Sequence, residues 1–252
     1  MKILSVVNQK GGVGKTTTSI NLSACLYKMK RRVLLVDLDP QSNATRGSGI
    51  DASMIQNSIN DVLLDRVHIE KVIIKSQFDG YDILPATPSL TESEVVLVTK
   101  DEREFILKNK LTSILSRYDY VIMDCPPSLN ILTVNSLVSA TGVLIPVQCE
   151  FYALQGLSEL INTINQIQNT SNQKLKIEGI LRTMFDSRNN LSNDVSDQLK
   201  EHFPSELYKT KIPRNIRVAE APSFGKSILE YDGLSKGSLS YYSLSGEIIK
   251  DE

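Results

Sequence analysis

The chain has 252 residues, of which 41% are hydrophobic and 23% are charged, a balance typical of a folded globular protein and not of a disordered one. Its 28 Lys and Arg against 29 Asp and Glu give a formal net charge of −1, which excludes a uniformly basic nucleic-acid coat and restricts any charged binding surface to a local patch. A single large domain is the simplest division, because no linker, repeat or low-complexity tract interrupts the chain.

The three cysteines, Cys25, Cys125 and Cys149, are far apart and form no C-x-x-C pair. This spacing favours a reducing, cytoplasmic location and buried structural thiols over a zinc site or a disulfide framework. The first residues run directly into a polar glycine-rich loop, so we expect no signal peptide. No stretch of about 18 apolar residues exists, so we expect no membrane-spanning helix.

Short apolar runs alternate with amphipathic helical patterns along the chain. Continuous apolar runs predict strands buried on both faces, and four of them occur, at 3–7, 33–36, 121–123 and 143–147. Helical patterns follow the first run, precede Tyr118 and cover 154–167. This alternation predicts an α/β fold with a mostly parallel twisted sheet flanked by helices. The polar stretch 186–193 predicts a loop, and 233–245 shows no clear pattern.

A glycine-rich loop lies between the first expected strand and the first expected helix. It reads Lys10-Gly11-Gly12-Val13-Gly14-Lys15-Thr16-Thr17. This order is typical of a phosphate-binding P-loop in a variant form, because Gln9 stands where the general pattern has its first glycine. Glycines let the backbone approach phosphates and point N–H groups at them, and the positive end of the helix adds to the attraction. We therefore expect residues 11–17 to bind a nucleotide, Lys15 to contact its β- and γ-phosphates, and Thr16 to bind Mg²⁺.

Two later strands end in carboxylates. Asp37 and Asp39 follow one apolar run, and Asp124 ends another. Ligand sites in open α/β sheets lie at the carboxyl ends of the strands, so these acids are expected near the phosphate loop. We expect Asp124 to hold Mg²⁺ through water, and Asp37 to lie nearer the metal than Asp39.

The lysine ahead of the glycines, Lys10, makes the loop similar to the deviant Walker A motif of the ParA/MinD ATPases. The D-x-D-P-Q motif at 37–41 also resembles that family. Further matching segments are 84–88, 146–154, 212–217 and 220–223. Over nearly its whole length the chain resembles the partition ATPases of the ParA/Soj type, which implies a single P-loop ATPase domain spanning 1–252.

The resemblance assigns catalytic roles to individual residues. It implies that Lys10 reaches across a dimer interface to the partner's nucleotide and acts in catalysis together with Lys15. A lysine that binds phosphate within its own subunit remains the alternative. The resemblance also implies that Asp39 positions or activates the attacking water, and that Asp39 belongs with Thr16 and Asp124 to the metal site.

The resemblance further implies ligands and partners. Pro213 and Asn215 would recognise the adenine of ATP, and Mg-ATP would drive a sandwich homodimer that binds double-stranded DNA without sequence preference. A ParB-type centromere-binding protein would stimulate slow hydrolysis, and the protein would associate with the nucleoid in the cytoplasm. Between residues 209 and 236 there are six basic and three acidic residues. By resemblance, DNA contacts are expected at Arg188, Arg217, Lys226 and Lys236.

Other classes of ATPase and carrier make different demands on the sequence. A membrane-surface ATPase of the MinD kind needs a basic amphipathic helix at its carboxyl end. Here Gly246 is expected to interrupt such a helix, and the chain ends in the acidic pair Asp251 and Glu252, so we expect no membrane binding. An iron–sulfur electron carrier would need paired cysteines. A ParA-like ATPase that positions another cargo without ParB cannot be separated from a partition ATPase by sequence.

Overall fold

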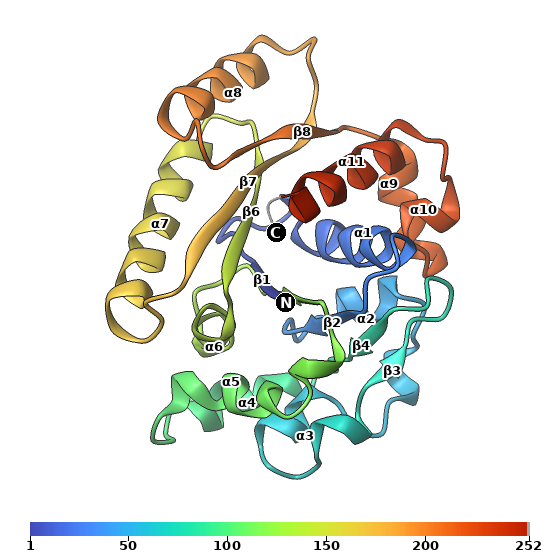
Figure 1. Cartoon of the computed structure of the whole chain (residues 1–252), viewed down its shortest axis with the longest axis vertical. Helices are drawn as coiled ribbons and strands as arrows, with labels where there is room; N and C mark the ends of the chain where they lie inside the picture. The colour runs from blue at the N-terminus through green and yellow to red at the C-terminus, as the bar shows by residue number, and fades with distance from the viewer. Residues whose placement is uncertain (251–252) are drawn as a thin grey trace.

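Eight strands form one sheet within residues 1–250, the part of the chain that the computed structural model describes (Figure 1). They are β1 (Lys2–Val6), β2 (Val33–Asp37), β3 (Ile74–Lys75), β4 (Asp82–Leu84), β5 (Tyr120–Asp124), β6 (Gly142–Gln148), β7 (Lys176–Phe185) and β8 (Leu207–Pro213). Their order across the sheet is β3-β4-β2-β5-β1-β6-β7-β8. Every neighbouring pair is parallel except β3 and β4. The α/β class and the four predicted strands are confirmed.

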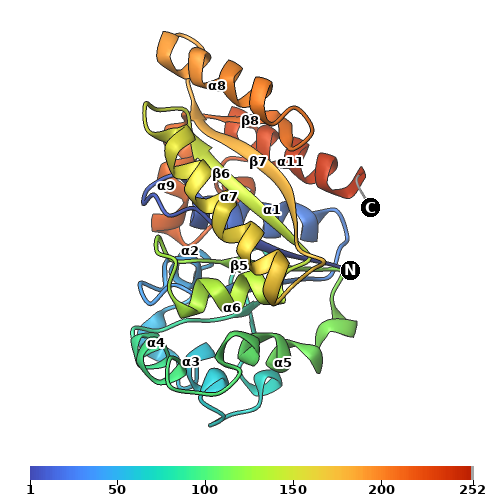
Figure 2. The ribbon, with the colours of Figure 1, turned by 90° about the vertical axis from the view of Figure 1, so that its left-hand side faces the viewer.

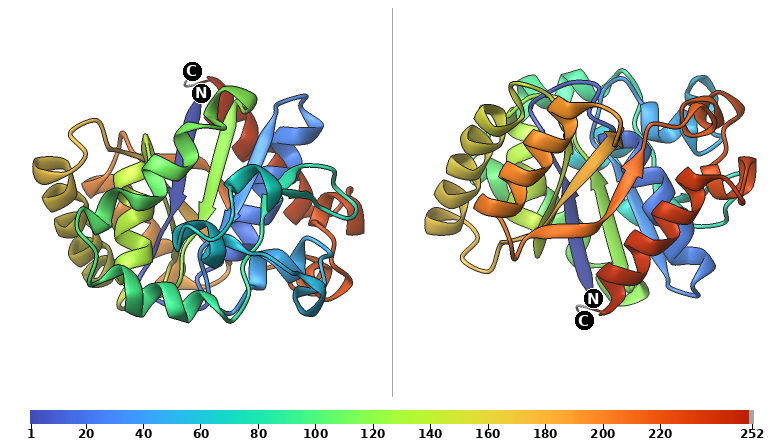
Figure 3. Two further views of the ribbon diagram at one scale, coloured as in Figure 1. Left: turned by 90° about the horizontal axis from the view of Figure 1, so that it is seen from below. Right: turned by 90° about the horizontal axis from the view of Figure 1, so that it is seen from above.

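Helices cover both faces of this sheet (Figures 2 and 3). They are α1 (Lys15–Lys28), α2 (Asn43–Gly47), α3 (Ile59–Leu63), α4 (Leu90–Leu97), α5 (Ile106–Thr112), α6 (Ile131–Ser139), α7 (Ala153–Thr170), α8 (Asn190–His202), α9 (Ile216–Glu220), α10 (Ile228–Tyr231) and α11 (Lys236–Lys250). A short 3₁₀ turn, η5 (Ala221–Phe224), joins α9 to the residues before α10. One layer contains α3 to α8, and the other contains α1, α2 and α9 to α11. Helices α1 and α11 lie side by side, as Figure 3 shows in its right-hand view.

Side chains along each strand alternate between two separate cores. In β1, Ile3 belongs to the core under α3 to α8, whereas Leu4 and Val6 belong to the core under α1 and α11. In β2, Leu34 and Leu35 divide in the same way. Because both faces are covered, the central strands are expected to be mostly apolar along their length, which is the pattern that the sequence shows in β2, β5 and β6.

The loop predicted over 186–193 is correct only up to Asn189. Helix α8 begins at Asn190, and the Asn189 side chain caps it by accepting the N–H of Leu191 at 3.0 Å. The polar first turn conceals the helix in the sequence, because its core-facing residues, Val195 and Leu199, come later. The helix expected before Tyr118 also differs, since α5 covers seven residues and 3₁₀ turns stand on both sides of it.

The segment without a clear sequence pattern, 233–245, lies mostly in helix α11. Its serines fit a helix because their hydroxyls donate to carbonyls four residues earlier, as Ser245 does to Tyr241 at 3.0 Å. Gly246 lies inside α11 and does not interrupt it, which makes that expectation wrong. Tyr241, Leu244 and Ile248 of α11 are buried in the core beside α1, which occupies this apolar face of the helix. The acidic pair Asp251 and Glu252 lies outside the described residues.

No helix within residues 1–250 combines the length and the apolar character needed to cross a membrane. The three cysteines are all buried, as predicted. Burial raises the pKa of both Cys25 and Cys125 to about 12 and that of Cys149 to about 11. The unreactive thiol form is therefore favoured at all three positions.

Two glycines test this packing in opposite directions. A Cβ at Gly179 in β7 would lie 2.2 Å from the buried ring of Tyr208, so Gly179→Ala should lower the free energy of unfolding by about 1–3 kcal/mol. A Cβ at Gly246 meets nothing within 4 Å, so Gly246→Ala should raise it by about 0.5–1 kcal/mol through helix propensity. Urea unfolding followed by circular dichroism measures both. Two variants of equal stability would contradict the packing described here.

Candidate active site

The glycine-rich loop connects β1 to α1 at the carboxyl edge of the sheet. Gly12 and Gly14 have φ angles of 76° and 88°, the left-handed region that favours glycine. The hydroxyl of Thr183 in β7 donates to the carbonyl of Val13 at 2.7 Å and holds the loop in place. No side chain caps α1 and its first turn contains no acid. The N–H groups of that turn are therefore left for an anion such as a phosphate.

The two lysines of the loop point in different directions. Lys15 is only 7% exposed, and its Nζ donates to the carbonyl of Lys10 at 3.1 Å. Burial lowers the pKa of Lys15, and the negative charges of Asp124 and Asp39 act against that shift. Lys10 instead extends outward and forms an exposed ion pair with Glu150 of its own chain. Lys15 is thus placed for a ligand inside the loop, and Lys10 for a ligand outside it.

Asp124 joins the end of β5 to the start of α1. Its carboxylate is fully buried and accepts the hydroxyls of Thr16 at 2.8 Å and Ser19 at 2.9 Å. The structure therefore brings together two residues that the sequence predicts for the metal site, Thr16 and Asp124. Ser19 was missed, although its position one helical turn after Thr16 places it on the same face of α1.

Asp37 bonds to the segment that follows β2. Its fully buried carboxylate accepts the N–H of Thr45 at 2.8 Å, the hydroxyl of Thr45 at 2.7 Å and the N–H of Asp39 at 3.1 Å. Both oxygens of Asp37 are thus bound to the chain itself, so this residue orders the segment that carries Asp39. Asp39 is 7% exposed, and one of its oxygens accepts the N–H of Gln41 at 2.9 Å. Thr45 could not be found from the sequence, because the motif ends four residues before it.

The oxygens at this edge fit a magnesium ion. Burial raises the pKa of Asp124, and the charge of neighbouring Asp37 adds to that rise. A cation beside them would oppose both causes, because it favours the charged carboxylate. Mg²⁺ typically uses one or two carboxylates and completes its shell with water and phosphate. Within residues 1–250 no three His, Cys, Asp or Glu side chains form a cluster that could hold a metal ion by themselves. A Mg²⁺ ion that is bound mainly by water and phosphate does not need such a cluster.

A cavity of about 370 Å³ opens beside the phosphate loop. It lies between the end of β8 and helix α11, and its lining includes Gly14, Thr17, Thr183, Met184, Ile212, Pro213, Asn215, Val218 and Tyr241. A volume of this size is within the range of small-ligand pockets. Met184 and Tyr241 were missed by sequence reasoning. Met184 has a φ of 48°, a backbone strain that non-glycine residues show most often at functional sites.

The two residues predicted for adenine recognition both line this cavity. The Asn215 side chain also caps α9, since its Oδ1 accepts the N–H groups of Arg217 at 2.8 Å and Val218 at 3.4 Å. The capping fixes the side chain and commits its oxygen. Its amide nitrogen remains as the donor for a ring nitrogen of a base, while the carbonyl of Pro213 can accept from an amino group.

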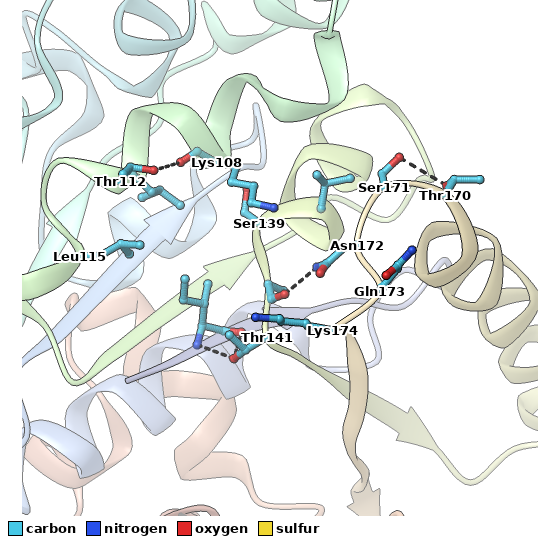
Figure 4. Close-up of a pocket in the computed structure, with 14 residues that line it drawn as sticks. Lys108, Thr112, Leu115, Ser139, Thr141, Thr170, Ser171, Asn172, Gln173 and Lys174 are labelled. Carbon is cyan, nitrogen blue, oxygen red and sulfur yellow. Dashed lines mark hydrogen bonds between the residues drawn. The ribbon is translucent and has the colours of Figure 1, made fainter.

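A second cavity, of about 550 Å³, lies at the opposite, amino edge of the strands (Figure 4). Its polar side chains bond to nearby backbone. Asn172 donates to the carbonyls of Leu137 at 3.0 Å and Ala140 at 2.7 Å, and Thr141 exchanges hydrogen bonds with Ile3. This cavity is remote from the glycine-rich loop and from Asp124, so it is not the candidate active site.

The arginines predicted to contact DNA follow the carboxyl ends of adjacent strands, Arg188 after β7 and Arg217 after β8. Both form exposed ion pairs within the chain. Arg188 pairs with Asp186 at 2.8 Å, and Arg217 pairs with Glu220 at 3.1 Å. Such exposed pairs are typically worth no more than about 1 kcal/mol, so a phosphate can replace the carboxylate at little cost.

The two predicted lysines lie further along the chain. Lys226 follows η5, and its Nζ is 5.0 Å from the centre of the Phe78 ring. Lys236 is exposed at the first turn of α11. Arg217, Lys226 and Lys236 therefore belong to consecutive carboxyl-terminal segments, whereas Arg188 comes from a separate loop.

Comparisons with known proteins place the chain in a family. The AAA domain family model matches residues 1–177. The chain is 48% identical to the sporulation initiation inhibitor protein Soj of Bacillus subtilis, over 98% of both chains. It is also 48% identical to the chromosome partitioning protein ParA of Myxococcus xanthus, over 99% of this chain and 88% of that one.

A solved structure extends the comparison to the whole fold. The cobyrinic acid a,c-diamide synthase of Mycobacterium smegmatis, with bound ADP and magnesium, superposes with a TM-score of 0.87 at 35% identity, over 99% of this chain and 94% of that one. The full-length relatives and the variant phosphate loop lead to one conclusion. The chain belongs to the ParA/Soj family of chromosome-partitioning ATPases.

Proposed function

We propose that the chain binds ATP with Mg²⁺, that ATP drives a sandwich homodimer, and that the dimer binds DNA without sequence preference. Slow hydrolysis, stimulated by a ParB-type partner, then releases the DNA and so supports segregation of a chromosome or plasmid. One observation carries the proposal. Helix α1 begins at Lys15 without a side-chain cap, and the hydroxyl of the next residue, Thr16, donates a hydrogen bond to Asp124.

The relatives carry the names of two activities, chromosome partitioning and cobyrinic acid a,c-diamide synthesis, and they differ in their sequence identity to this chain. The relatives named for chromosome partitioning are 42–48% identical over nearly the whole chain. The structural relative named as a synthase is 35% identical. The solved structure of that synthase contains ADP and magnesium. We therefore assign partition as the function and take only the nucleotide site from the synthase.

The chain's residues would act on ATP mainly by position and charge, because phosphoryl transfer requires little covalent participation from the protein. Lys15 and the N–H groups of α1 would hold the β- and γ-phosphates. Bound Mg²⁺, held by Thr16 and Asp124, would neutralise negative charge on those phosphates. Asp39 would orient the attacking water, and its place is set by the bond from its own N–H to Asp37.

Dimerisation would depend on the lysine that leaves the loop. Lys10 is about half exposed and carries its charge away from its own phosphate site. Its bond to Glu150 is exposed and therefore inexpensive to exchange for a phosphate of a second subunit. Both active sites of a dimer would then contain a lysine from each chain.

The phosphate loop is tested by Lys15→Ala. This change removes the main cation from the β- and γ-phosphates, so ATP affinity should fall and hydrolysis should drop by about 100-fold or more. Binding of a fluorescent ATP analogue and release of phosphate measure the two effects. The control is Lys28→Ala, an exposed lysine at the other end of the same helix. Normal turnover by Lys15→Ala would exclude the proposed phosphate site.

The separation of dimerisation from hydrolysis is tested by two variants. Asp39→Ala should bind ATP and hydrolyse it slowly, so that an ATP-bound dimer accumulates. Lys10→Ala should bind ATP and remain monomeric, because the partner's phosphate loses its second lysine. Size-exclusion chromatography with light scattering, with ATP or ADP, distinguishes these states. Lys75→Ala, which removes another exposed lysine from an ion pair, here with Asp82, is the control. If Lys10→Ala dimerises like the unmodified chain, this lysine does not act across an interface.

DNA binding should require ATP, ignore base sequence and weaken steeply with salt. Each neutralised phosphate contributes a slope of about −0.9 in log K against log[salt], so a dimer making about four to six contacts should give a slope of about −4 to −5. Arg217→Ala should reduce affinity and make the slope shallower while dimerisation persists. Fluorescence anisotropy on random duplexes measures this.

The matched control for the DNA experiment is Arg32→Ala, because Arg32 is also exposed and paired, with Asp119, but lies at the amino edge of the sheet. Equal binding with ATP and ADP would contradict the proposal. Binding to anionic vesicles in place of DNA would support the membrane-surface alternative instead.

A further inference from the structure

A buried arginine in β7 directly precedes Thr183 and Met184, two residues that line the cavity assigned to adenine. Arg182 in β7 is 2% exposed, and within residues 1–250 it forms no ion pair with a carboxylate. Its Nη1 donates to the hydroxyl of Ser196 at 3.0 Å. Its Nη2 donates to the carbonyls of Tyr208 at 2.5 Å and Lys209 at 3.4 Å, and its Nε has no partner. A buried charge with this set of bonds is costly, so its position calls for a reason.

The reason lies in the pairing of β7 with β8. Ile180 is opposite Leu207, yet Arg182 is opposite Lys211, so two steps along β7 correspond to four along β8. Residues 208–210 therefore form a bulge in the edge strand of the sheet. The bulge removes carbonyls from the ladder, and the guanidinium of Arg182 bonds to two of them.

A carboxylate bonds to the donors of the same bulge from the other side. Glu247 in α11 accepts the N–H of Lys209 at 2.9 Å, the N–H of Thr210 at 2.8 Å and the hydroxyl of Thr210. Figure 1 shows β8 passing between α8 and α11, the helices that carry Ser196 and Glu247. We call Arg182 and Glu247, with the bulge 208–210 between them, the charged clamp.

The charged clamp lies directly before the wall of the adenine cavity. Pro213 follows Thr210 by three residues on the same strand, and Tyr241 of α11 forms the facing wall. Helix α9, which follows β8 directly, packs closely on α11, because a Cβ at Gly237 in α11 would lie 2.2 Å from Val218 and 3.6 Å from its capping residue Asn215. The segment from the end of β8 through α9 must therefore keep a constant spacing from α11 for the cavity between them to keep its shape.

We propose that the charged clamp is a positioning device for the adenosine half of the nucleotide. Arg182 and Glu247 set the place of residues 213–215 relative to α11, and the phosphate half is held separately by the loop at 11–17. This inference rests on the proposed function, since it assumes that the cavity receives the base of ATP.

The test compares two ligands that differ by the adenosine moiety. Competition against a fluorescent ATP analogue gives the affinities of the full-length chain for ATP and for inorganic tripolyphosphate, both with magnesium. Arg182→Met and Glu247→Ala should each weaken ATP by about tenfold, the effect of losing one charge-assisted hydrogen bond. Tripolyphosphate affinity should stay unchanged. Arg182→Lys and Glu247→Gln, which keep part of the bonding, should lie between these variants and the unmodified chain.

Controls separate the possible outcomes. Lys250→Ala, an exposed change one turn along α11 from Glu247, should alter neither affinity. Thermal melting identifies any variant that fails to fold. In that case Thr210→Val removes only the hydrogen bond from the Thr210 hydroxyl to Glu247 and should cause a smaller loss of ATP affinity. Equal losses for ATP and tripolyphosphate, or no loss of ATP affinity, would overturn the inference. If the unmodified chain binds tripolyphosphate as tightly as ATP, the adenine cavity of the proposed function fails instead.

Discussion

The hydrogen bonds from Thr16 and Ser19 to Asp124 are the interaction on which the rest of the site depends. They connect the first two turns of α1 to the end of β5 in the middle of the sheet, and so fix the phosphate loop between β1 and α1. Asp124 is buried and forms no ion pair with a basic side chain in the described part of the chain, residues 1–250. The two hydroxyls offset only part of the free-energy cost of burying this carboxylate, and a bound cation would offset more of it.

The edge strand β8 is held in place by different interactions from those that hold the central strands. Central strands are apolar on both faces and pack into two cores, whereas the edge strand β8 is held by polar groups through its backbone. Arg182 and Glu247 bond to opposite sides of the same three residues. An edge strand with a bulge lacks the ladder bonds that position a central strand, so side chains from β7 and α11 replace them. These contacts fix the position of β8 and therefore the shape of the cavity next to it.

Local residue order led to the prediction of the phosphate loop. The strand, the glycine loop and the Lys-Thr pair are contiguous, and the structure brings Thr16 and Asp124, both predicted for the metal site, into hydrogen-bond contact. Asp37 shows where such reasoning stops. Its position at a strand end predicts a place nearer the metal than that of Asp39, and the structure adds that its oxygens accept hydrogen bonds from Thr45 and from the backbone of Asp39. A motif gives the type and spacing of residues, and it does not give which lone pairs are already used.

The sequence by itself determined the α/β class, the four central strands and the chemistry of the phosphate loop, because continuous apolar runs and glycine spacing are local signals. The helix at α11 and the start of α8 were decided by tertiary packing, since their serines and asparagines have no strong preference until a core or a cap is available. The joining of β8 to α11, through a carboxylate 37 residues from the amide it binds, is also tertiary. No local pattern encodes a contact between residues so far apart, because it forms only when the sheet order brings them together.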